Sequence, residues 1–326
     1  MKFETLILLI SFIVSIILGI IIIPILKKLK VGQIERDDGP QSHLKKQGTP
    51  TMGGIIMIIS MIIVITGAYI FFTAKGQNDI ANKLLPILLL TIGFGLIGFI
   101  DDFKKLVLKN TTGLKPTYKM IGLLVISVAY VIYLIYGLHI GTETYIPIMK
   151  QYINIPTILY IPFAIIVILA TTNAINLTDG IDGLSSSVSA IIITCLTIIG
   201  VMFGLEEISI FGSVVIGATL GFLMFNLHPA KVFMGDTGSL LLGGVISAIA
   251  LYLKMPLILI VIALIPVLET LSVIIQVAYF KKTGNRIFKM APLHHHFELS
   301  GWKESKVVIV FSLCTLVLCV IGLKII

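Results

Sequence analysis

The sequence predicts an all-α polytopic integral membrane protein with ten transmembrane helices, forming a single membrane domain over residues 1–326. The chain is 57% hydrophobic and only 12% charged, about half the charged fraction of a typical soluble domain. Apolar runs of about 20 residues, the length that crosses a bilayer as a helix, alternate with short polar loops. The runs are continuously apolar rather than alternating, which argues against a transmembrane β-barrel.

The predicted spans are the runs long enough to cross a bilayer. They cover residues 3–26, 52–73, 84–100, 117–136, 157–172, 185–204, 208–226, 238–254, 255–280 and 306–326. We expect the first run to be retained as a span, because no small-residue cleavage site follows it closely. Pro266 lies inside the ninth span and should kink it, because proline removes a backbone donor and clashes with the preceding turn.

Lysine and arginine predict the orientation. Most of the 24 basic residues fall in the loops after the first, third, seventh and ninth spans. Because basic loops stay in the cytoplasm, we expect both termini on the extracytoplasmic side, with the ligand site at the cytoplasmic face. The cytoplasmic loops expected to form the active site are 27–51, 101–116, 173–184, 227–237 and 281–305. The net charge of +8 is explained by this topology, so we expect no nucleic-acid partner.

The longest segment expected on the extracytoplasmic side lies around residues 137–156, and the sequence does not decide whether it forms a hairpin or an interfacial helix.

Residues 231–239, KVFMGDTGS, form a short polar turn between two long apolar runs. Asp236 lies between two glycines, so the backbone there can fold tightly and approach a ligand. A carboxylate just outside a membrane span suits a hard cation such as Mg²⁺. Gly-Asp-Thr-Gly is also ordinary turn chemistry, so this stretch alone leaves both interpretations open.

Two adjacent carboxylates, Asp101 and Asp102, end the third span. They oppose the helix dipole, which favours cations at a C-terminus. A metal, a nearby lysine or a proton-transfer role would explain them, and adjacent acids can raise one pKa into the range of a general base. The alternative is a solvated helix end neutralised by Lys104 and Lys105.

The fifth span is followed by NAINLTDGIDG, residues 173–183. Its polar residues Asn173, Asn176, Asp179 and Asp182 recur every three positions. On a straight helix this set drifts by about 60° per step and cannot form one stripe. The glycines at 180 and 183 therefore predict that the helix ends and the loop folds inward. No lysine or arginine lies in the loop to neutralise its carboxylates, which favours a functional interpretation.

Two further loops carry basic and imidazole groups. The loop 32–54 combines Arg36, Lys45 and Lys46 with the return GTPTMGG, which suits a pyrophosphate; the alternative is an inside-positive loop with small residues packing in the next span. The last loop contains PLHHHFE. Adjacent imidazoles point in different directions and rarely chelate one ion, so hydrogen bonding to phosphate or sugar is favoured. Glu269, inside the ninth span, is left out of the candidate site.

Together these motifs resemble one family. GQIERDDGP…GTPTMGG, DDFKK, NAINLTDGIDGL, NLHPAKVFMGDTGSL and MAPLHHHFELSGW resemble the phospho-N-acetylmuramoyl-pentapeptide transferases (the MraY family) of the polyprenyl-phosphate N-acetylhexosamine-1-phosphate transferase superfamily. The resemblance implies transfer of phospho-MurNAc-pentapeptide from UDP-MurNAc-pentapeptide to undecaprenyl phosphate, with Mg²⁺ as cofactor and UMP released. It implies a place in the bacterial cytoplasmic membrane.

The resemblance also implies roles for single residues. Asp236 becomes the leading Mg²⁺ ligand, and Asp101 and Asp102 become the base or the pair that positions the lipid phosphate. The implied nucleoside pocket consists of Asn176, Asp179, Gly180, Asp182, Asn226 and Phe233. The implied phosphate contacts are Lys46, Thr51, Lys105 and Lys119. The implied contacts to pyrophosphate or sugar are His294, His295 and His296.

Two other functions stay open. A transferase that moves GlcNAc-1-phosphate from UDP-GlcNAc to a polyprenyl phosphate would share the acidic motifs, although the triple-histidine loop favours the MurNAc-pentapeptide substrate. A secondary transporter would place polar residues at the membrane midplane, whereas the acids other than Glu269 lie at span ends. The sequence also does not choose between direct attack and a covalent aspartyl intermediate, or between a monomer and a homodimer.

Overall fold

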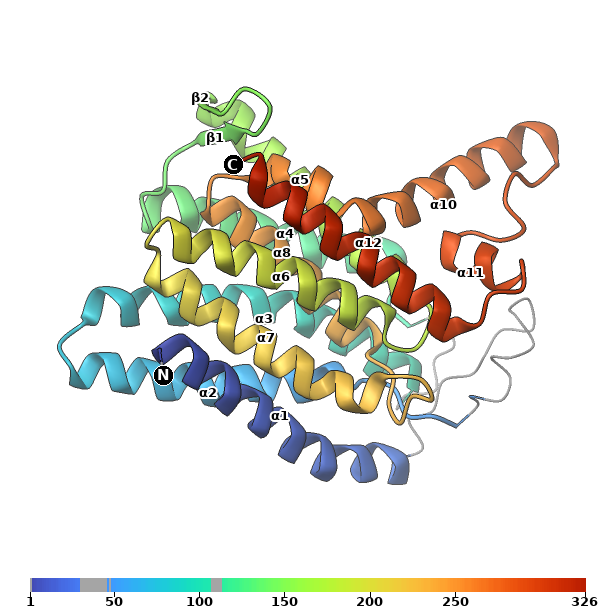
Figure 1. The fold of residues 1–326 in the computed structure, drawn as a ribbon, viewed down its shortest axis with the longest axis horizontal. Helices are drawn as coiled ribbons and strands as arrows, with labels where there is room; N and C mark the ends of the chain where they lie inside the picture. Colours follow the sequence, from blue (N-terminus) through green and yellow to red (C-terminus); the bar gives the residue numbers. More distant parts are fainter. Residues whose placement is uncertain (1, 30–45, 47, 107–112) are drawn as a thin grey trace.

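The computed structural model describes residues 2–29, 46, 48–106 and 113–326, and this part of the chain is mainly helical (Figure 1). Ten of its helices are long and apolar enough to cross a membrane, which confirms the predicted polytopic all-α class. They are α1 (Phe3–Lys28), α2 (Gly54–Ala74), α3 (Asn78–Leu106), α4 (Pro116–Ile132), α5 (Thr157–Thr178), α6 (Leu184–Met202), α7 (Glu206–Asn226), α8 (Gly235–Tyr252), α10 (Leu264–Thr283) and α12 (Glu304–Lys324). A π-helical turn, Tyr133–Gly137, extends α4.

Several helices are longer than their apolar runs. α3 begins at Asn78 and ends at Leu106, beyond both ends of the predicted span. α5 continues through the polar residues after 172 and ends at Thr178. Helical hydrogen bonds are made by the backbone, so a helix can continue after its side chains have become polar. Asp101, Asp102 and Asn176 therefore lie on helices and not in loops.

The ninth predicted span is wrong as a single helix. It consists of a 3₁₀ turn (Pro256–Ile258), the short helix α9 (Leu259–Ile262) and α10. The break is at Ala263, whose φ of −106° and ψ of 25° leave the helical region. Pro266 then falls in the first turn of α10, where its missing N–H costs no helical hydrogen bond. The kink predicted at Pro266 itself stays a prediction.

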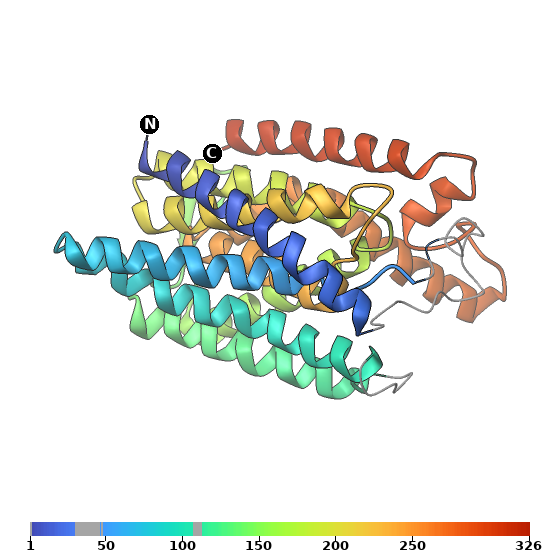
Figure 2. The same cartoon turned by 90° about the horizontal axis from the view of Figure 1, so that it is seen from below.

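The segment left open between a hairpin and a helix forms an antiparallel hairpin. Strand β1 (Glu143–Ile146) pairs with β2 (Gln151–Asn154), with Glu143 opposite Asn154. Figure 1 and Figure 2 place both termini at the same end of the bundle as this hairpin, and the short helix α11 (Leu293–Glu298) lies at the other end. Which side of the membrane each end faces stays a prediction.

Helix α8 is the centre of the bundle, because every residue from Thr237 to Tyr252 is buried. Glycines let its neighbours approach its backbone. A Cβ added at Gly98 of α3 would lie 2.1 Å from the carbonyl oxygen of Asp236. A Cβ added at Gly54 of α2 would lie 2.2 Å from the backbone nitrogen of Gly238. The first turn of α8, which carries Asp236, is therefore held directly against α2 and α3.

We expect Gly98→Ala to destabilise the protein by about 1–3 kcal/mol, because the added methyl group meets backbone that cannot rotate away. Thermal unfolding in detergent measures the effect. The matched control is Gly67→Ala in α2, where an added Cβ meets nothing within 4 Å and the change to alanine favours the helix. Equal melting temperatures for the two variants would contradict the proposed close packing.

Candidate functional site

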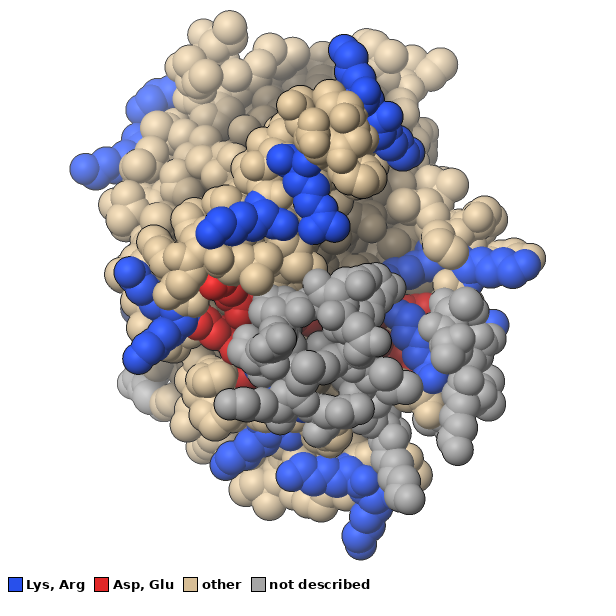
Figure 3. Space-filling model, turned by 90° about the vertical axis from the view of Figure 1, so that its right-hand side faces the viewer, with Lys and Arg blue, Asp and Glu red and all other residues tan. Residues whose placement is uncertain are grey.

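Five aspartates from three segments of the chain converge at the end of the bundle that carries α11. Asp101 and Asp102 end α3, Asp236 begins α8, and Asp179 and Asp182 lie between α5 and α6. One oxygen from each of Asp101, Asp102 and Asp236 lies within 4.8 Å of the other two. Figure 3 shows acidic side chains near the middle of this face and lysines and arginines around its rim. The predicted convergence of the acidic motifs is therefore observed.

Asp102 anchors the N-terminus of α8. Its carboxylate accepts hydrogen bonds from the backbone N–H groups of Asp236 (3.2 Å) and Thr237 (2.9 Å), and from the Thr237 hydroxyl (2.6 Å). These first N–H groups have no acceptor inside the helix, and the helix dipole favours an anion there. Gly235 beside it has a φ of 73°, and a Cβ there would lie 2.6 Å from Asp102 Oδ2. Asp102 is thus a cap that orients Asp236.

Asp236 projects from this capped turn into a group of lysines and an amide. Its Oδ2 accepts hydrogen bonds from Lys119 Nζ at 2.9 Å and Lys105 Nζ at 3.1 Å. Its Oδ1 accepts one from Asn176 Nδ2 at 2.8 Å. Lys105 Nζ also lies 2.5 Å from Asp101 Oδ2. The Asp236 side chain is 16% exposed and that of Asp101 only 2%, so Asp236 is the more accessible of these two carboxylates.

A second acidic group lies nearby and contains three residues, Asp182, His228 and Glu304, with ligand atoms within 4.8 Å of one another. Lys46 Nζ contacts Asp182 Oδ1 at 2.7 Å and Glu304 Oε1 at 2.5 Å. His228 Nδ1 lies 3.0 Å from Asp182 Oδ2. Burial acts to lower the pKa of Lys46, but its hydrogen bonds to the two carboxylates outweigh burial and raise it. Lys46 is therefore fully charged and already paired.

Both acidic groups have the composition of a metal site. The group of Asp101, Asp102 and Asp236 offers oxygen atoms alone, which is the donor type that Mg²⁺ prefers. The second group includes an imidazole, a ligand that suits transition metals better. Lysine ammonium groups balance the carboxylates in both. The buried acidic groups could thus bind a metal ion, and the first fits a hard cation better.

His294 is fully buried under the loop that contains Gly180. Its backbone N–H donates to Glu269 Oε1 at 3.1 Å, and its Nδ1 lies 3.2 Å from Glu269 Oε2. A Cβ added at Gly180 would lie 2.1 Å from His294 Nε2, so this glycine makes room for the ring. With no exposed surface, His294 is poorly placed for the predicted contact with substrate. Its contacts tie α11 to α10 and to the loop after α5.

The other two histidines point elsewhere, as expected for adjacent residues. His295 Nδ1 lies 2.9 Å from Glu298 Oε2 within α11. His296 Nδ1 accepts a hydrogen bond from the Lys289 backbone N–H at 3.2 Å. Both rings are half-buried, so these two can still face a ligand. The triple-histidine motif is therefore one structural histidine followed by two candidate binding residues.

Asn226 holds the turn before α8. It is 3% exposed, accepts a hydrogen bond from Ser186 Oγ at 2.5 Å and donates one to the Val232 carbonyl at 3.0 Å. Both ends of its amide are therefore bound to the protein. This geometry supports a positioning role for Asn226 in place of the predicted substrate contact.

The glycine-rich segment 48–54 pairs with the turn that contains Phe233. The Phe233 N–H donates to the Pro50 carbonyl at 2.8 Å, and its carbonyl accepts from the Gly53 N–H at 2.9 Å. Thr51 is 5% exposed within this pair of segments, while the Phe233 side chain is half-buried. Phe233 thus remains a candidate for stacking on a base. Arg36 and Lys45, predicted as phosphate contacts, lie outside the described residues.

Asp179 is close enough to both acidic groups to respond to their charges. Burial raises the pKa of its carboxyl well above the usual value, and the negative charges of Asp236, Asp102 and Asp182 raise it further. Ionising this side chain therefore costs folding free energy in the absence of a compensating cation. Members of both acidic groups therefore raise the pKa of the same carboxyl.

Comparisons with known proteins decide the family. The model of glycosyl transferase family 4 matches residues 84–254. A phospho-N-acetylmuramoyl-pentapeptide-transferase of Clostridium botulinum (strain Alaska E43 / Type E3) is 52% identical over 316 residues, covering 97% of this chain and 94% of the relative. The chain belongs to the phospho-N-acetylmuramoyl-pentapeptide-transferase family. Proteins of the same name from Acetivibrio thermocellus and Caldicellulosiruptor bescii are 49% and 46% identical, covering 96% and 97% of this chain and 92% and 95% of the relatives.

Three residues at this candidate site were not among the predicted site residues. Glu304 and His228 complete the second acidic group, and Glu269 accepts the backbone N–H of His294. Glu304 begins α12. The helix dipole favours an acid at this position, so the sequence alone gave no reason to expect a functional role for it. An acid inside a span is a functional candidate by default, and Glu269 carried that signal.

We expect Asp179→Asn to raise the melting temperature of the transferase by about 2 °C or more at pH 8. The folded-state pKa of Asp179 is raised, so ionisation costs nothing below the unfolded value of about 4 and costs progressively more as pH rises to the folded value. Asparagine removes this cost, and the gain should shrink towards pH 4.5.

Thermal unfolding in detergent at both pH values measures this effect. The control is Asp79→Asn, which removes an exposed carboxylate at the start of α3 and should give no gain. A gain for Asp179→Asn of the same size at both pH values would show that charge is not its cause.

Proposed function

We propose that the protein transfers phospho-MurNAc-pentapeptide from UDP-MurNAc-pentapeptide to undecaprenyl phosphate, giving undecaprenyl-diphospho-MurNAc-pentapeptide and UMP. Its relatives carry the name of this transfer. The observation that carries the proposal is the group of Asp101, Asp236, Lys105 and Lys119, which brings two carboxylates and two ammonium groups together at the ends of spanning helices. This arrangement suits a phosphoryl transfer, which needs mainly positioning and charge neutralisation.

The described side chains divide this work. Asp236 and Asp101 would hold the Mg²⁺, and Asp102 fixes the direction of Asp236 through the backbone of α8. The bound ion would neutralise charge on the phosphoryl oxygens. Lys119 and Lys105 supply positive charge for phosphate groups beside Asp236. Asn176 fixes the other oxygen of Asp236. The base role expected for Asp101 stays a prediction.

We place the site at the cytoplasmic face of the bacterial cytoplasmic membrane. One substrate is a soluble, highly anionic nucleotide, and the other is a phosphate on a lipid, so they can meet only at a membrane surface. The basic side chains around this end of the bundle (Figure 3) support the assignment, because lysine and arginine are retained on the cytoplasmic side. Membership in a transferase family removes the support for a transporter.

The decisive assay measures UMP released by the purified protein with undecaprenyl phosphate and one of two nucleotides. We expect release with UDP-MurNAc-pentapeptide, loss of release on chelation of divalent ions, and restoration by Mg²⁺. The second nucleotide, UDP-GlcNAc, should give none. Release with UDP-GlcNAc alone would instead identify a GlcNAc-1-phosphate transferase.

Asp236→Asn should reduce transfer by on the order of 100-fold or more, because it removes the charge that pairs with two lysines and would hold the ion. The change preserves the shape of the side chain and leaves the capping bonds to the backbone in place. UMP release and melting temperature should be measured together. Glu206→Gln, at an exposed position at the start of α7, is the control and should retain full activity. Near-normal transfer by a folded Asp236→Asn protein would exclude Asp236 from the chemistry.

A further inference from the structure

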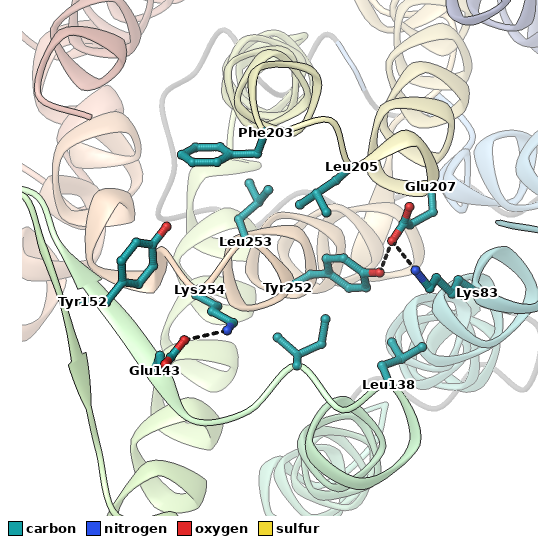
Figure 4. Close-up of a pocket in the computed structure, with 11 residues that line it drawn as sticks. Lys83, Leu138, Glu143, Tyr152, Phe203, Leu205, Glu207, Tyr252, Leu253 and Lys254 are labelled. Atoms are coloured by element: carbon teal, nitrogen blue, oxygen red, sulfur yellow. Dashed lines mark hydrogen bonds and ion pairs between the residues drawn. The ribbon is translucent and has the colours of Figure 1, made fainter. Parts of the chain in front are cut away.

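A cavity of about 340 Å³ (Figure 4) lies at the end of the bundle that carries the hairpin, away from the acidic groups. It is lined by the start of α3, the hairpin, the connection between α6 and α7, and the end of α8. None of these residues belongs to the candidate transferase site. The cavity is therefore independent of the chemistry proposed above.

One wall of the cavity holds a buried carboxylate with two partners. Glu207 is 5% exposed, and its Oε1 accepts a hydrogen bond from Lys83 Nζ at 2.9 Å and another from the Tyr252 hydroxyl. These bonds hold a charged group within an otherwise apolar end of the bundle. Lys83 remains 39% exposed, so its ammonium group borders the cavity.

The facing wall holds a second, more open ion pair. Lys254 Nζ lies 2.7 Å from Glu143 Oε2, and the two side chains are 29% and 50% exposed. Figure 4 shows the two ion pairs on different sides of the cavity, with Leu138, Leu205 and Leu253 between and around them. The lining thus combines two ammonium groups, two carboxylates and an apolar surface.

This charge pattern selects the kind of ligand. The two lysines balance the two glutamates, so an ion of a single charge would meet equal attraction and repulsion. Each ammonium group has three N–H donors, and the hydrogen bonds above account for one on each lysine. The remaining donors can bind an anionic group, while the exposed Glu143 carboxylate can bind a cationic one. A zwitterion satisfies both.

The position of the cavity selects the source of that zwitterion. It lies where α3 and α7 begin and where α6 and α8 end, which is the level of the lipid headgroups for helices that span a bilayer. Phe203 and Tyr152, both 48% exposed, border it, and aromatic rings are typical of this level. We propose that the cavity binds the headgroup of a zwitterionic phospholipid, with its phosphate at Lys254 and its ammonium group at Glu143.

Native mass spectrometry of the detergent-purified protein tests this proposal with two added lipids, phosphatidylethanolamine and phosphatidylglycerol, and with soluble glycerophosphoethanolamine. We expect phosphatidylethanolamine to bind most tightly and Lys254→Met to weaken its binding about tenfold, the loss typical of one charge-assisted hydrogen bond. Lys75→Met is the matched control, because Lys75 is exposed at the same end and lies over Phe71 outside the cavity.

Lys254 is chosen because it belongs to the more exposed pair, and Lys83→Met would leave the buried Glu207 without its lysine. The melting temperature of each variant verifies that it is folded, and Glu143→Gln provides a second folded test that should also weaken phosphatidylethanolamine. Equal binding of the two lipids, or unchanged binding by both variants, would overturn the proposal. Equal binding of the soluble headgroup would overturn the assignment to a membrane lipid.

Discussion

The contact between Asp102 and the first turn of α8 is the interaction on which the site depends. Two backbone N–H groups and one hydroxyl converge on this carboxylate, so the end of α3 and the beginning of α8 form one rigid unit. The same turn carries Asp236, so these hydrogen bonds help to set the direction in which its side chain projects. Gly98 and Gly235 allow the approach, because a Cβ at Gly98 would meet the backbone of this turn and a Cβ at Gly235 would meet the Asp102 carboxylate. Helix packing and chemistry therefore share one constraint.

Charge pairing is the second organising feature of this end of the molecule. An unpaired buried charge is costly, and lysines pair with carboxylates in both acidic groups. Lys46 and Lys119 come from other elements, whereas Lys105 lies one turn after Asp101 on α3. The basic groups expected to meet phosphates are thus already engaged with aspartates. A phosphate that approaches Lys119 or Lys105 must compete with Asp236 for the same ammonium groups. In the proposed function, substrate binding would therefore exchange ionic partners at this site, and Asp179 responds to charges in both groups.

Carboxylates pair with lysines at both ends of the bundle, but the groups that result are different. At the end with α11, carboxylates from five positions collect around lysines, in two groups that could hold a metal ion. At the end with the hairpin, two separate ion pairs flank an apolar cavity, which leaves no net charge. Helix α8 connects them, with Asp236 in its first turn and Tyr252 at its last residue.

The sequence by itself determined the class, the number of spanning helices and the motifs whose acids converge, because hydropathy and helix-end polarity are local properties. It failed where distant residues decide the outcome. Lys46 and Glu304 lie 258 positions apart and form one ion pair, and the burial of His294 depends on Glu269 in another helix. The capping role of Asp102 likewise depends on the beginning of another helix. Only the tertiary structure brings such partners together, since no local pattern records which helix ends will meet.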